Sequence, residues 1–202
     1  PFLVLLIIGS IFIIRQQHNM PYQHDEGMVF GTVYHITYQY DSDLKPEIEA
    51  ELQKVNNSLS PFEKGSVISK INDNKDPEAD DMFVEVFSLA EEVSAQTGGA
   101  FDITVAPLVN MWGFGTKQFH RPEKESIDSL MRFVGFHKVA LKDRHVVKEN
   151  PNIQLDCSGI AKGFGCDVVA RFLQSKGIKN FMVEIGGEVV TSGNSEKRVP
   201  WK

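Results

Sequence analysis

The chain is 202 residues long, with 42% hydrophobic, 24% charged and 10% aromatic residues. This composition is typical of a folded globular protein and excludes a disordered or collagen-like chain. The formal net charge is −6 at pH 7 and no run of Lys and Arg interrupts it, so we expect no nucleic-acid partner. A chain of this length buries about 70% of its unfolded surface and needs no metal or disulfide to fold.

The N-terminal part begins with an apolar run from Phe2 to Ile14 that ends at Arg15. A run of about 13 residues is short for a membrane-spanning helix, which needs about 20, and it also fits the core of a signal peptide. No small-x-small cleavage site and no cysteine for lipid attachment follow it. We therefore expect residues 1–27 to form an uncleaved hydrophobic anchor and a polar linker. A removed signal peptide and a buried hydrophobic helix are the alternatives.

The first element expected after the linker is a strand over residues 28–40. Tyr34, Ile36 and Tyr38 alternate there with more polar neighbours, which predicts a half-buried strand. Apolar residues at helical spacing then predict three amphipathic helices. These helices are expected at residues 44–55, 82–93 and 160–173, with Gly98-Gly99 ending the second and Gly177 the third.

Short strands are expected in the second half of the chain. They lie at 138–141, 145–147, 153–156, 180–185 and 188–191, with Gly186-Gly187 as the turn between the last two. Residues 101–112 contain Pro107, and their pattern leaves open a short strand followed by a helix or a loop that lines a pocket. Because strands and helices are mixed without strict alternation, the fold class expected is α+β, with mixed sheets and packed helices.

Several common enzyme signatures are absent from the sequence. The six histidines form no metal-ligand pair, and neither a nucleophile elbow nor a phosphate-binding P-loop occurs. Cys157 and Cys166 are nine positions apart in a segment expected to be helical. This spacing places them about 13 Å apart, too far for a disulfide.

The segment from Leu155 to Gly163 has the pattern of a ligand-binding helix start. Asp156 closes an expected strand, small residues follow, and Lys162 lies in the first helical turn. Backbone N–H groups at a helix start favour a phosphate, to which Lys162 would add charge. Asp156 could accept hydrogen bonds from a base or a ribose hydroxyl. An Asp cap beside a solvated Lys is the alternative for these residues.

Aromatic residues gather after the Gly98-Gly99 break. Phe101 lies beside Asp102, and the run from Pro107 to Gly115 adds a Trp and a second Phe. An apolar wall with a few polar anchors suits a planar ring system. An aromatic cluster by itself is more often part of a core, and Gly186-Gly187 by itself is a hairpin turn.

Five segments occur in the order seen in one protein family: Phe30 to Tyr34, Phe101 to Val105, Pro107 to Gly115, Asp156 to Gly163 and Val183 to Glu188. From about Met28 to Trp201 the sequence therefore resembles the ApbE family of FAD:protein FMN transferases. The resemblance implies an ApbE-like fold and one FAD-binding domain over residues 28–202. Family members continue past the segment that ends in Pro200-Trp201, so the resemblance implies a domain that is incomplete at its C-terminus.

The activity implied by the resemblance is a Mg²⁺-dependent transfer of the FMN moiety of FAD. The acceptor is a Thr or Ser hydroxyl of a target flavoprotein in a membrane electron-transfer or ion-translocating complex, and AMP is released. The implied location is the bacterial inner membrane, facing the periplasm, with attachment through the N-terminal segment. A membrane-anchored FAD-binding protein without transfer activity and an FAD pyrophosphatase are the alternatives.

The resemblance also implies a set of binding residues. The positions that contact FAD in the family fall on Phe30, Phe62, Ala100, Phe101, Asp102, Asp156 and Lys162. The position that binds the metal falls on Gly159, which offers only its backbone carbonyl. Phe30 stands where many members have Met, and the family pattern assigns no catalytic side chain within these residues.

Overall fold

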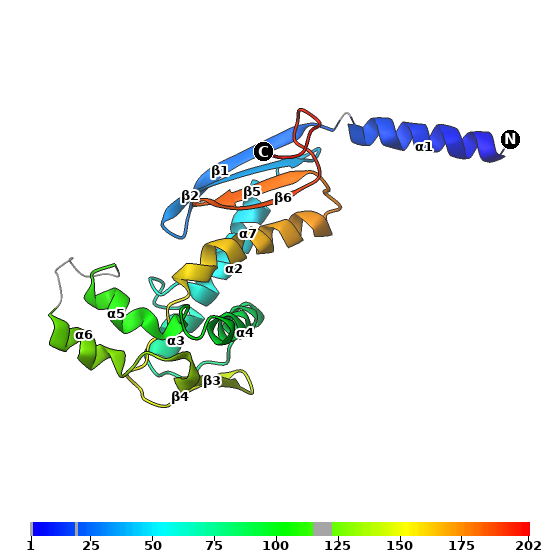
Figure 1. The fold of residues 1–202 in the computed structure, drawn as a ribbon. Coiled ribbons are helices and arrows are strands. Elements are labelled where there is room, and N and C mark those ends of the chain that lie inside the picture. The colour runs from blue at the N-terminus through cyan, green and yellow to red at the C-terminus, as the bar shows by residue number, and fades with distance from the viewer. Residues whose placement is uncertain (1, 19, 115–122) are drawn as a thin grey trace. The chain divides into compact units, whose positions relative to one another are not determined.

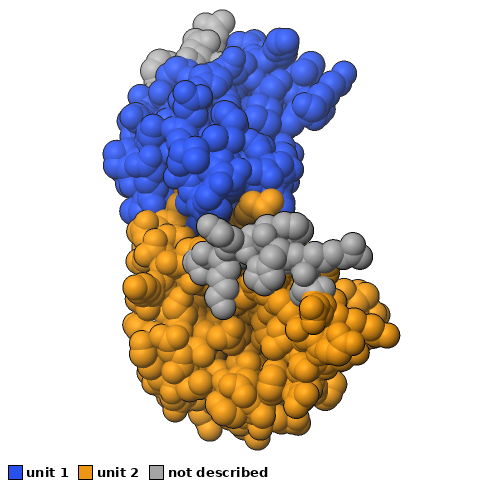
Figure 2. Space-filling view, turned by 90° about the vertical axis from the view of Figure 1, so that its left-hand side faces the viewer, with its two compact units in different colours: residues 1–51, 166–202 blue, residues 52–165 orange. Residues whose placement is uncertain are grey.

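The computed structural model describes residues 2–18, 20–114 and 123–202. The chain divides into two compact units, which Figure 2 distinguishes by colour. Unit 1 consists of residues 1–51 and 166–202, and unit 2 of residues 52–165. Helices α2 (Lys45–Leu59) and α7 (Ser158–Ser175) each contribute residues to both units.

Helix α1 spans Phe2–His18 and contains the apolar run at the start of the chain. The side chains from Phe2 to Ile8 are each 52–75% exposed. Within the described ranges, no helix has both the length and the apolar content required to cross a membrane. The anchor stays a prediction.

Unit 1 is built on a four-stranded antiparallel sheet with the order β1-β2-β5-β6, whose strands lie side by side in Figure 1. The strands are β1 (Tyr22–Val29), β2 (Thr32–Gln39), β5 (Phe181–Ile185) and β6 (Glu188–Ser192). Alternate residues of β2 and β5 form its core: Tyr34, Ile36, Tyr38, Phe181, Val183 and Ile185 are at most 1% exposed. The alternation predicted for β2 is therefore confirmed.

The prediction of one strand over 28–40 is wrong, because a turn at Phe30-Gly31 divides it. Val29 pairs with Thr32, and both turn residues have positive φ, 52° and 75°. These are the features of a two-residue type I′ hairpin. β1 then extends back into the polar segment predicted as a linker. As an edge strand, β1 is held by backbone pairing with β2 and buries only Asp25, so its sequence lacks an apolar alternation.

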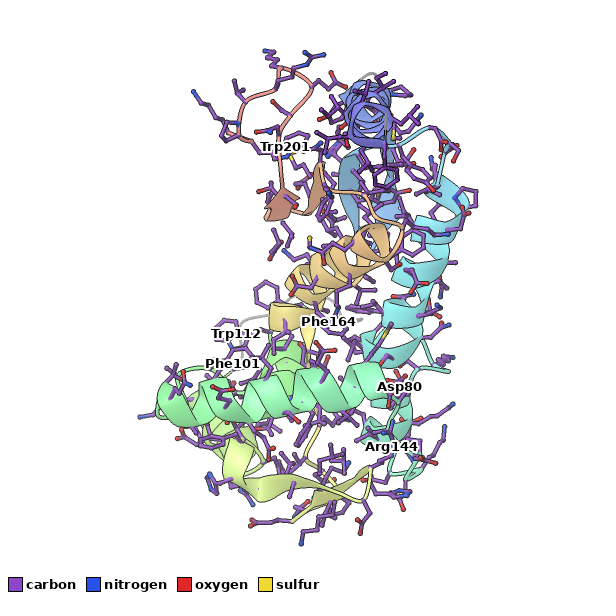
Figure 3. The ribbon with its side chains drawn as sticks, turned by 90° about the vertical axis from the view of Figure 1, so that its right-hand side faces the viewer. Asp80, Phe101, Trp112, Arg144, Phe164 and Trp201 are labelled. Carbon is purple, nitrogen blue, oxygen red and sulfur yellow. The ribbon has the colours of Figure 1, made fainter. Side chains whose placement is uncertain are left out.

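Unit 2 is mainly helical, with one β-hairpin. Its elements are α3 (Val67–Asn72), α4 (Asp81–Gln96), α5 (Ala106–Met111), α6 (Lys124–Met131), β3 (Val139–Lys142) and β4 (His145–Lys148). The predicted helix over 82–93 and the strands near 138–147 are confirmed as α4 and the β3–β4 hairpin. Asp80 caps α4 by accepting a hydrogen bond from Phe83 N–H (2.8 Å), and it lies at the N-terminal end of α4 in Figure 3. The sequence patterns did not indicate α3 or α6.

The segment left open at 101–112 forms a short 3₁₀ turn, Ile103–Val105, followed by α5. Pro107 lies in the first turn of α5, where its missing N–H leaves no intrahelical bond unmade.

The strand predicted at 153–156 does not form. Ile153 and Leu155 are fully buried, as their alternation suggests, but no neighbouring strand pairs with them in the described residues. The backbone polar groups are satisfied differently. The Asn72 side chain binds both the N–H and the C=O of Leu155, and the carbonyl of Ile103 accepts from the N–H of Asp156.

Candidate functional site

A pocket of about 370 Å³ in unit 2 brings together two of the predicted site residues, Phe62 and Asp156. It is bounded by the loop after α2, the end of α3, helix α5 and the start of α7. Its lining residues are Pro61, Phe62, Lys64, Ser69, Asn72, Asp73, Ala106, Val109, Asn110, Phe114, Gln154, Leu155, Asp156 and Ser158. This volume is within the range of pockets that bind small molecules.

Two phenylalanine rings at this pocket are unusually exposed. Phe62 is 61% exposed and Phe114 is 74% exposed. An exposed aromatic ring beside a pocket offers a flat apolar surface on which a planar ligand can stack. Phe114 belongs to the aromatic run that the sequence analysis singled out, although the family pattern did not assign it a contact.

Among the described residues, one carboxylate oxygen of Asp156 accepts a hydrogen bond and the other does not. Its Oδ1 accepts a hydrogen bond from Ser158 N–H (2.7 Å) at the start of α7. Its Oδ2 accepts no hydrogen bond from the residues that the structure describes. The capping alternative thus accounts for Oδ1 of this carboxylate, and a ligand contact at Oδ2 stays a prediction.

The first turns of α7 carry Gly159 and Lys162, the former exposed and the latter half-exposed. A Cβ atom added to Gly159 would lie 3.3 Å from Cε2 of the Phe101 ring. Phe101, labelled in Figure 3, therefore packs closely against this turn because Gly159 has no side chain. The roles predicted for Gly159 and Lys162 in ligand binding stay predictions.

Asp102 uses its carboxylate within unit 2. Its Oδ1 accepts from Thr104 N–H (2.8 Å) and Thr104 Oγ1 (2.6 Å), and its Oδ2 accepts from Phe136 N–H (2.7 Å). Thr104 Oγ1 in turn accepts from Gly135 N–H (2.7 Å). The Asp102 side chain thus joins two loops, while the neighbouring Ala100 is exposed.

Phe30 belongs to unit 1, where it occupies the first position of the β1–β2 turn. Its φ of 52° is uncommon for a bulky residue. Its contact with FAD stays a prediction. A larger pocket of about 770 Å³ also lies in unit 1, and none of the predicted site residues lines it.

Both cysteines are free, as their spacing predicts, and the structure shows that both are buried. Burial, with a smaller contribution from the charge of Asp156, raises the pKa of the Cys157 thiol to about 12. A thiol with such a pKa stays protonated at neutral pH, so Cys157 is unsuited to act as a nucleophile.

Among residues 2–18, 20–114 and 123–202, no group of three or more His, Cys, Asp and Glu side chains could hold a metal ion. The donors at the start of α7 are the Oδ2 atom of Asp156 and the backbone carbonyl of Gly159. Oxygen atoms of this kind suit Mg²⁺, which usually completes its shell with waters and ligand phosphates.

Asn72 is a residue of this site that the sequence analysis missed. It ends α3, lines the pocket and binds Leu155, which is 83 positions away. No local pattern distinguishes it from other polar residues at helix ends, so only the tertiary contact identifies it.

Comparison with known proteins finds FAD:protein FMN transferases among the relatives of this chain. The chain is 35% identical over 192 residues to an FAD:protein FMN transferase of Vibrio cholerae, covering 89% of this chain and 57% of the relative. It is 37% identical over 195 residues to one of Haemophilus influenzae, covering 87% and 56%. The chain therefore spans a little over half the length of these curated relatives.

Solved structures agree with the predicted fold class. The flavin transferase ApbE from Vibrio cholerae matches with a TM-score of 0.84 and 35% identity, over 90% of this chain and 62% of that chain. The apo form of the flavinyl transferase ApbE from Pseudomonas stutzeri matches with a TM-score of 0.83 and 28% identity, over 90% and 64%. The ApbE family pattern itself matches residues 30–202, and this chain belongs to the ApbE family.

Proposed function

We propose that this protein is an FAD:protein FMN transferase. The observation that carries the proposal is the pocket of unit 2, which is lined by both the exposed Phe62 ring and Asp156, just before the start of α7. A planar ring and a polar group beside it are what a flavin nucleotide requires. The names of the relatives support the same assignment.

The proposed reaction moves a phosphoryl-linked flavin from one oxygen to another. The hydroxyl oxygen of a Thr or Ser on the target bonds to the phosphorus on the FMN side of the FAD pyrophosphate. The bond from that phosphorus to the bridging oxygen breaks, and AMP leaves with the electron pair. The hydroxyl proton passes to solvent or to a base. Transfer of this kind depends mainly on positioning and electrostatics.

The residues of this chain have separate tasks in the proposal. The Phe62 ring stacks on a planar part of FAD, and Asp156 Oδ2 accepts a hydrogen bond from a hydroxyl or amino group of the ligand. The N–H groups at the start of α7 and the Lys162 ammonium attract the pyrophosphate. At residues 100–102 the proposed contact is made by the main chain and the Phe101 ring, because both Asp102 oxygens already accept hydrogen bonds within unit 2.

Mg²⁺ is part of the proposal, with the Gly159 carbonyl as the donor that this chain would supply. When bound, the ion would neutralise charge on the pyrophosphate. Ligand oxygens and waters would complete the coordination.

Membrane attachment through residues 1–27 and a periplasm-facing location are also proposals. The row of exposed apolar side chains from Phe2 to Ile8 supports attachment, because such a surface is costly in water. A target among flavoproteins of membrane electron-transfer or ion-translocating complexes rests on the family resemblance alone.

The test is intact-mass spectrometry of a target domain carrying an acceptor Thr, after incubation with this chain, FAD and Mg²⁺. We expect a mass gain equal to one FMN phosphoester, accompanied by free AMP. A target with Val in place of the acceptor Thr and a reaction with a chelator are the controls, and both should show no gain. FAD that is cleaved without target modification would indicate a pyrophosphatase. FAD that is bound but not cleaved would indicate a binding protein without transfer activity.

A further inference from the structure

The segment from Ile153 to Asp156 crosses unit 2 as an extended chain that is held mostly by side chains. Lys148 Nζ donates to the carbonyls of Ile71 and Ile153, both at 3.0 Å. Asn72 binds Leu155 in both directions, with Leu155 N–H donating to Oδ1 (2.7 Å) and Nδ2 donating to the Leu155 carbonyl (2.9 Å). One asparagine side chain thus takes the place of a neighbouring strand.

The position of Asn72 connects this support to the candidate site. Asn72 lines the pocket at the end of α3, and the residue that it binds immediately precedes Asp156. On the other side, the N–H of Asp156 donates to the Ile103 carbonyl at 2.7 Å. The peptide groups next to the Asp156 carboxylate are therefore fixed by two partners, and only one of these partners is a side chain that can be replaced.

We infer that Asn72 is a positioning residue for flavin binding, which acts by holding Asp156 in place. The inference rests on the proposed function. Leu155 is fully buried while Asn72 is present, and its N–H and C=O both lose their partner if Asn72 is removed. Unpaired buried backbone groups are costly, and the segment is expected to shift until they find partners. A shift of this segment moves Asp156 Oδ2 away from the ligand.

The asparagine amide is suited to this task because it is at once a donor and an acceptor. Alanine provides neither group. Glutamine keeps both groups but places them one methylene farther from the backbone, so the pairing survives while Leu155 shifts. Asn74 provides a control, since its Nδ2 donates to the carbonyl of Pro151 (3.1 Å), which precedes this segment and is farther along the chain from Asp156.

The deciding experiment is a double-mutant cycle on FAD affinity, measured by calorimetry with the full chain. Asn72→Ala is expected to raise the FAD Kd about tenfold, because small displacements of a polar contact are costly in a preorganised site. In the Asp156→Asn background, Asn72→Ala should raise the FAD Kd less than about twofold. The effects of the two substitutions are not additive if Asn72 acts through Asp156. Asn74→Ala should stay within about twofold in both backgrounds.

If the Asn72→Ala variant does not fold, Asn72→Gln takes its place. We then expect Asn72→Gln to raise the FAD Kd less in the Asp156→Asn background than in the wild type. Equal losses in the two backgrounds would overturn the inference, because they would show an effect on the site that does not pass through Asp156. An unchanged FAD Kd in Asn72→Ala would overturn it as well.

A second readout needs no flavin. The Ser158 N–H donates to Asp156 Oδ1, so its hydrogen exchange reports the placement of that carboxylate. We expect faster exchange at Ser158 in Asn72→Ala and unchanged exchange in Asn74→Ala. Unchanged protection in both variants overturns the inference. A wild-type chain that binds no FAD contradicts the proposed function instead, and the exchange measurement then decides separately whether Asn72 holds Asp156.

Discussion

Buried hydroxyl groups show how single residues contribute to this fold. Within the described residues, Ser94 Oγ is the buried side-chain polar atom that has no hydrogen-bond partner. Ser58 Oγ is equally buried but donates to Asp80 Oδ1 at 2.7 Å. A buried hydroxyl without a partner costs about 1–3 kcal/mol relative to water, whereas a bonded one stabilises the protein.

We therefore predict opposite effects for two serine-to-alanine substitutions. Ser94→Ala should raise the free energy of unfolding by about 1 kcal/mol, because it removes an unpaired polar group. Ser58→Ala should lower it by about 1 kcal/mol, because Asp80 loses a partner. Urea unfolding of both variants checks the prediction. A destabilised Ser94→Ala variant would contradict it.

Asp25 is a carboxylic acid in the sheet of unit 1, where it accepts a hydrogen bond from the Tyr38 hydroxyl (2.9 Å). Burial raises the pKa of Asp25, and the Tyr38 bond opposes this rise only in part. The folded state therefore holds this proton more tightly than the unfolded chain does. Protonated Asp25 therefore stabilises the folded state below the ordinary Asp pKa, about 3.9. This stabilisation is lost as the pH rises through the raised pKa of Asp25.

We predict that Asp25→Asn removes this pH dependence. Asn keeps an acceptor for Tyr38 and carries no charge, so the variant should gain stability relative to the wild type as the pH rises from about 4 to neutrality. Thermal unfolding across this range measures the effect. Asp128→Asn, on the exposed face of α6, is the control and should follow the wild type. A constant difference between Asp25→Asn and the wild type at all pH values would contradict the prediction.

The β1–β2 hairpin illustrates a conflict at the level of an element. Its turn requires positive φ at two successive positions, and the first is occupied by Phe30. The left-handed conformation costs an ordinary residue about 1 kcal/mol, while Asn adopts it readily. A residue whose backbone conformation is unfavourable for its side chain suggests a role other than stability. For Phe30, the flavin contact predicted from the resemblance would be such a role.

Phe30→Asn should therefore stabilise the chain by about 1 kcal/mol and weaken FAD binding at the same time. Chemical denaturation and FAD titration of the same variant measure the two effects. Phe62→Ala is the matched comparison, because Phe62 is 61% exposed and its loss should weaken FAD binding with little change in stability. If FAD affinity is unchanged in Phe30→Asn, Phe30 does not contact the flavin.

Elements also differ in how well the sequence indicates them. Helix α4 and the strands β3 and β4 are predicted by residue patterns that extend over only a few neighbouring positions. The 28–40 segment was assigned to a single strand because Phe30 is not a residue expected at a left-handed turn. The strand predicted at 153–156 has the burial of a strand, but its partners are the Asn72 and Lys148 side chains.

For the molecule as a whole, ligand binding and stability are linked. A ligand that binds only the folded chain raises the free energy of unfolding by about 2.7 kcal/mol at one hundred times its Kd. We expect FAD and riboflavin each to raise the melting temperature if unit 2 holds the flavin. Lys162→Ala should reduce the shift produced by FAD and leave that of riboflavin unchanged, because the ammonium faces the pyrophosphate in the proposed site.

Differential scanning fluorimetry with each ligand tests this prediction. Lys142→Ala, on the exposed end of β3, is the control and should behave as the wild type with both ligands. Equal losses for FAD and riboflavin in Lys162→Ala would place the ammonium away from the phosphates.

Family membership, the α+β class and the main helices were readable from the sequence, because they depend on residue order and on periods within a few turns. The expected FAD residues also came from ordered motifs. The tertiary structure decided which of these residues share a pocket, that the Asp102 carboxylate joins two loops, and that Asn72 binds Leu155, the residue before Asp156. These features depend on hydrogen bonds between residues as far apart as 83 positions. Patterns of neighbouring residues in the sequence do not indicate which distant residues form such pairs.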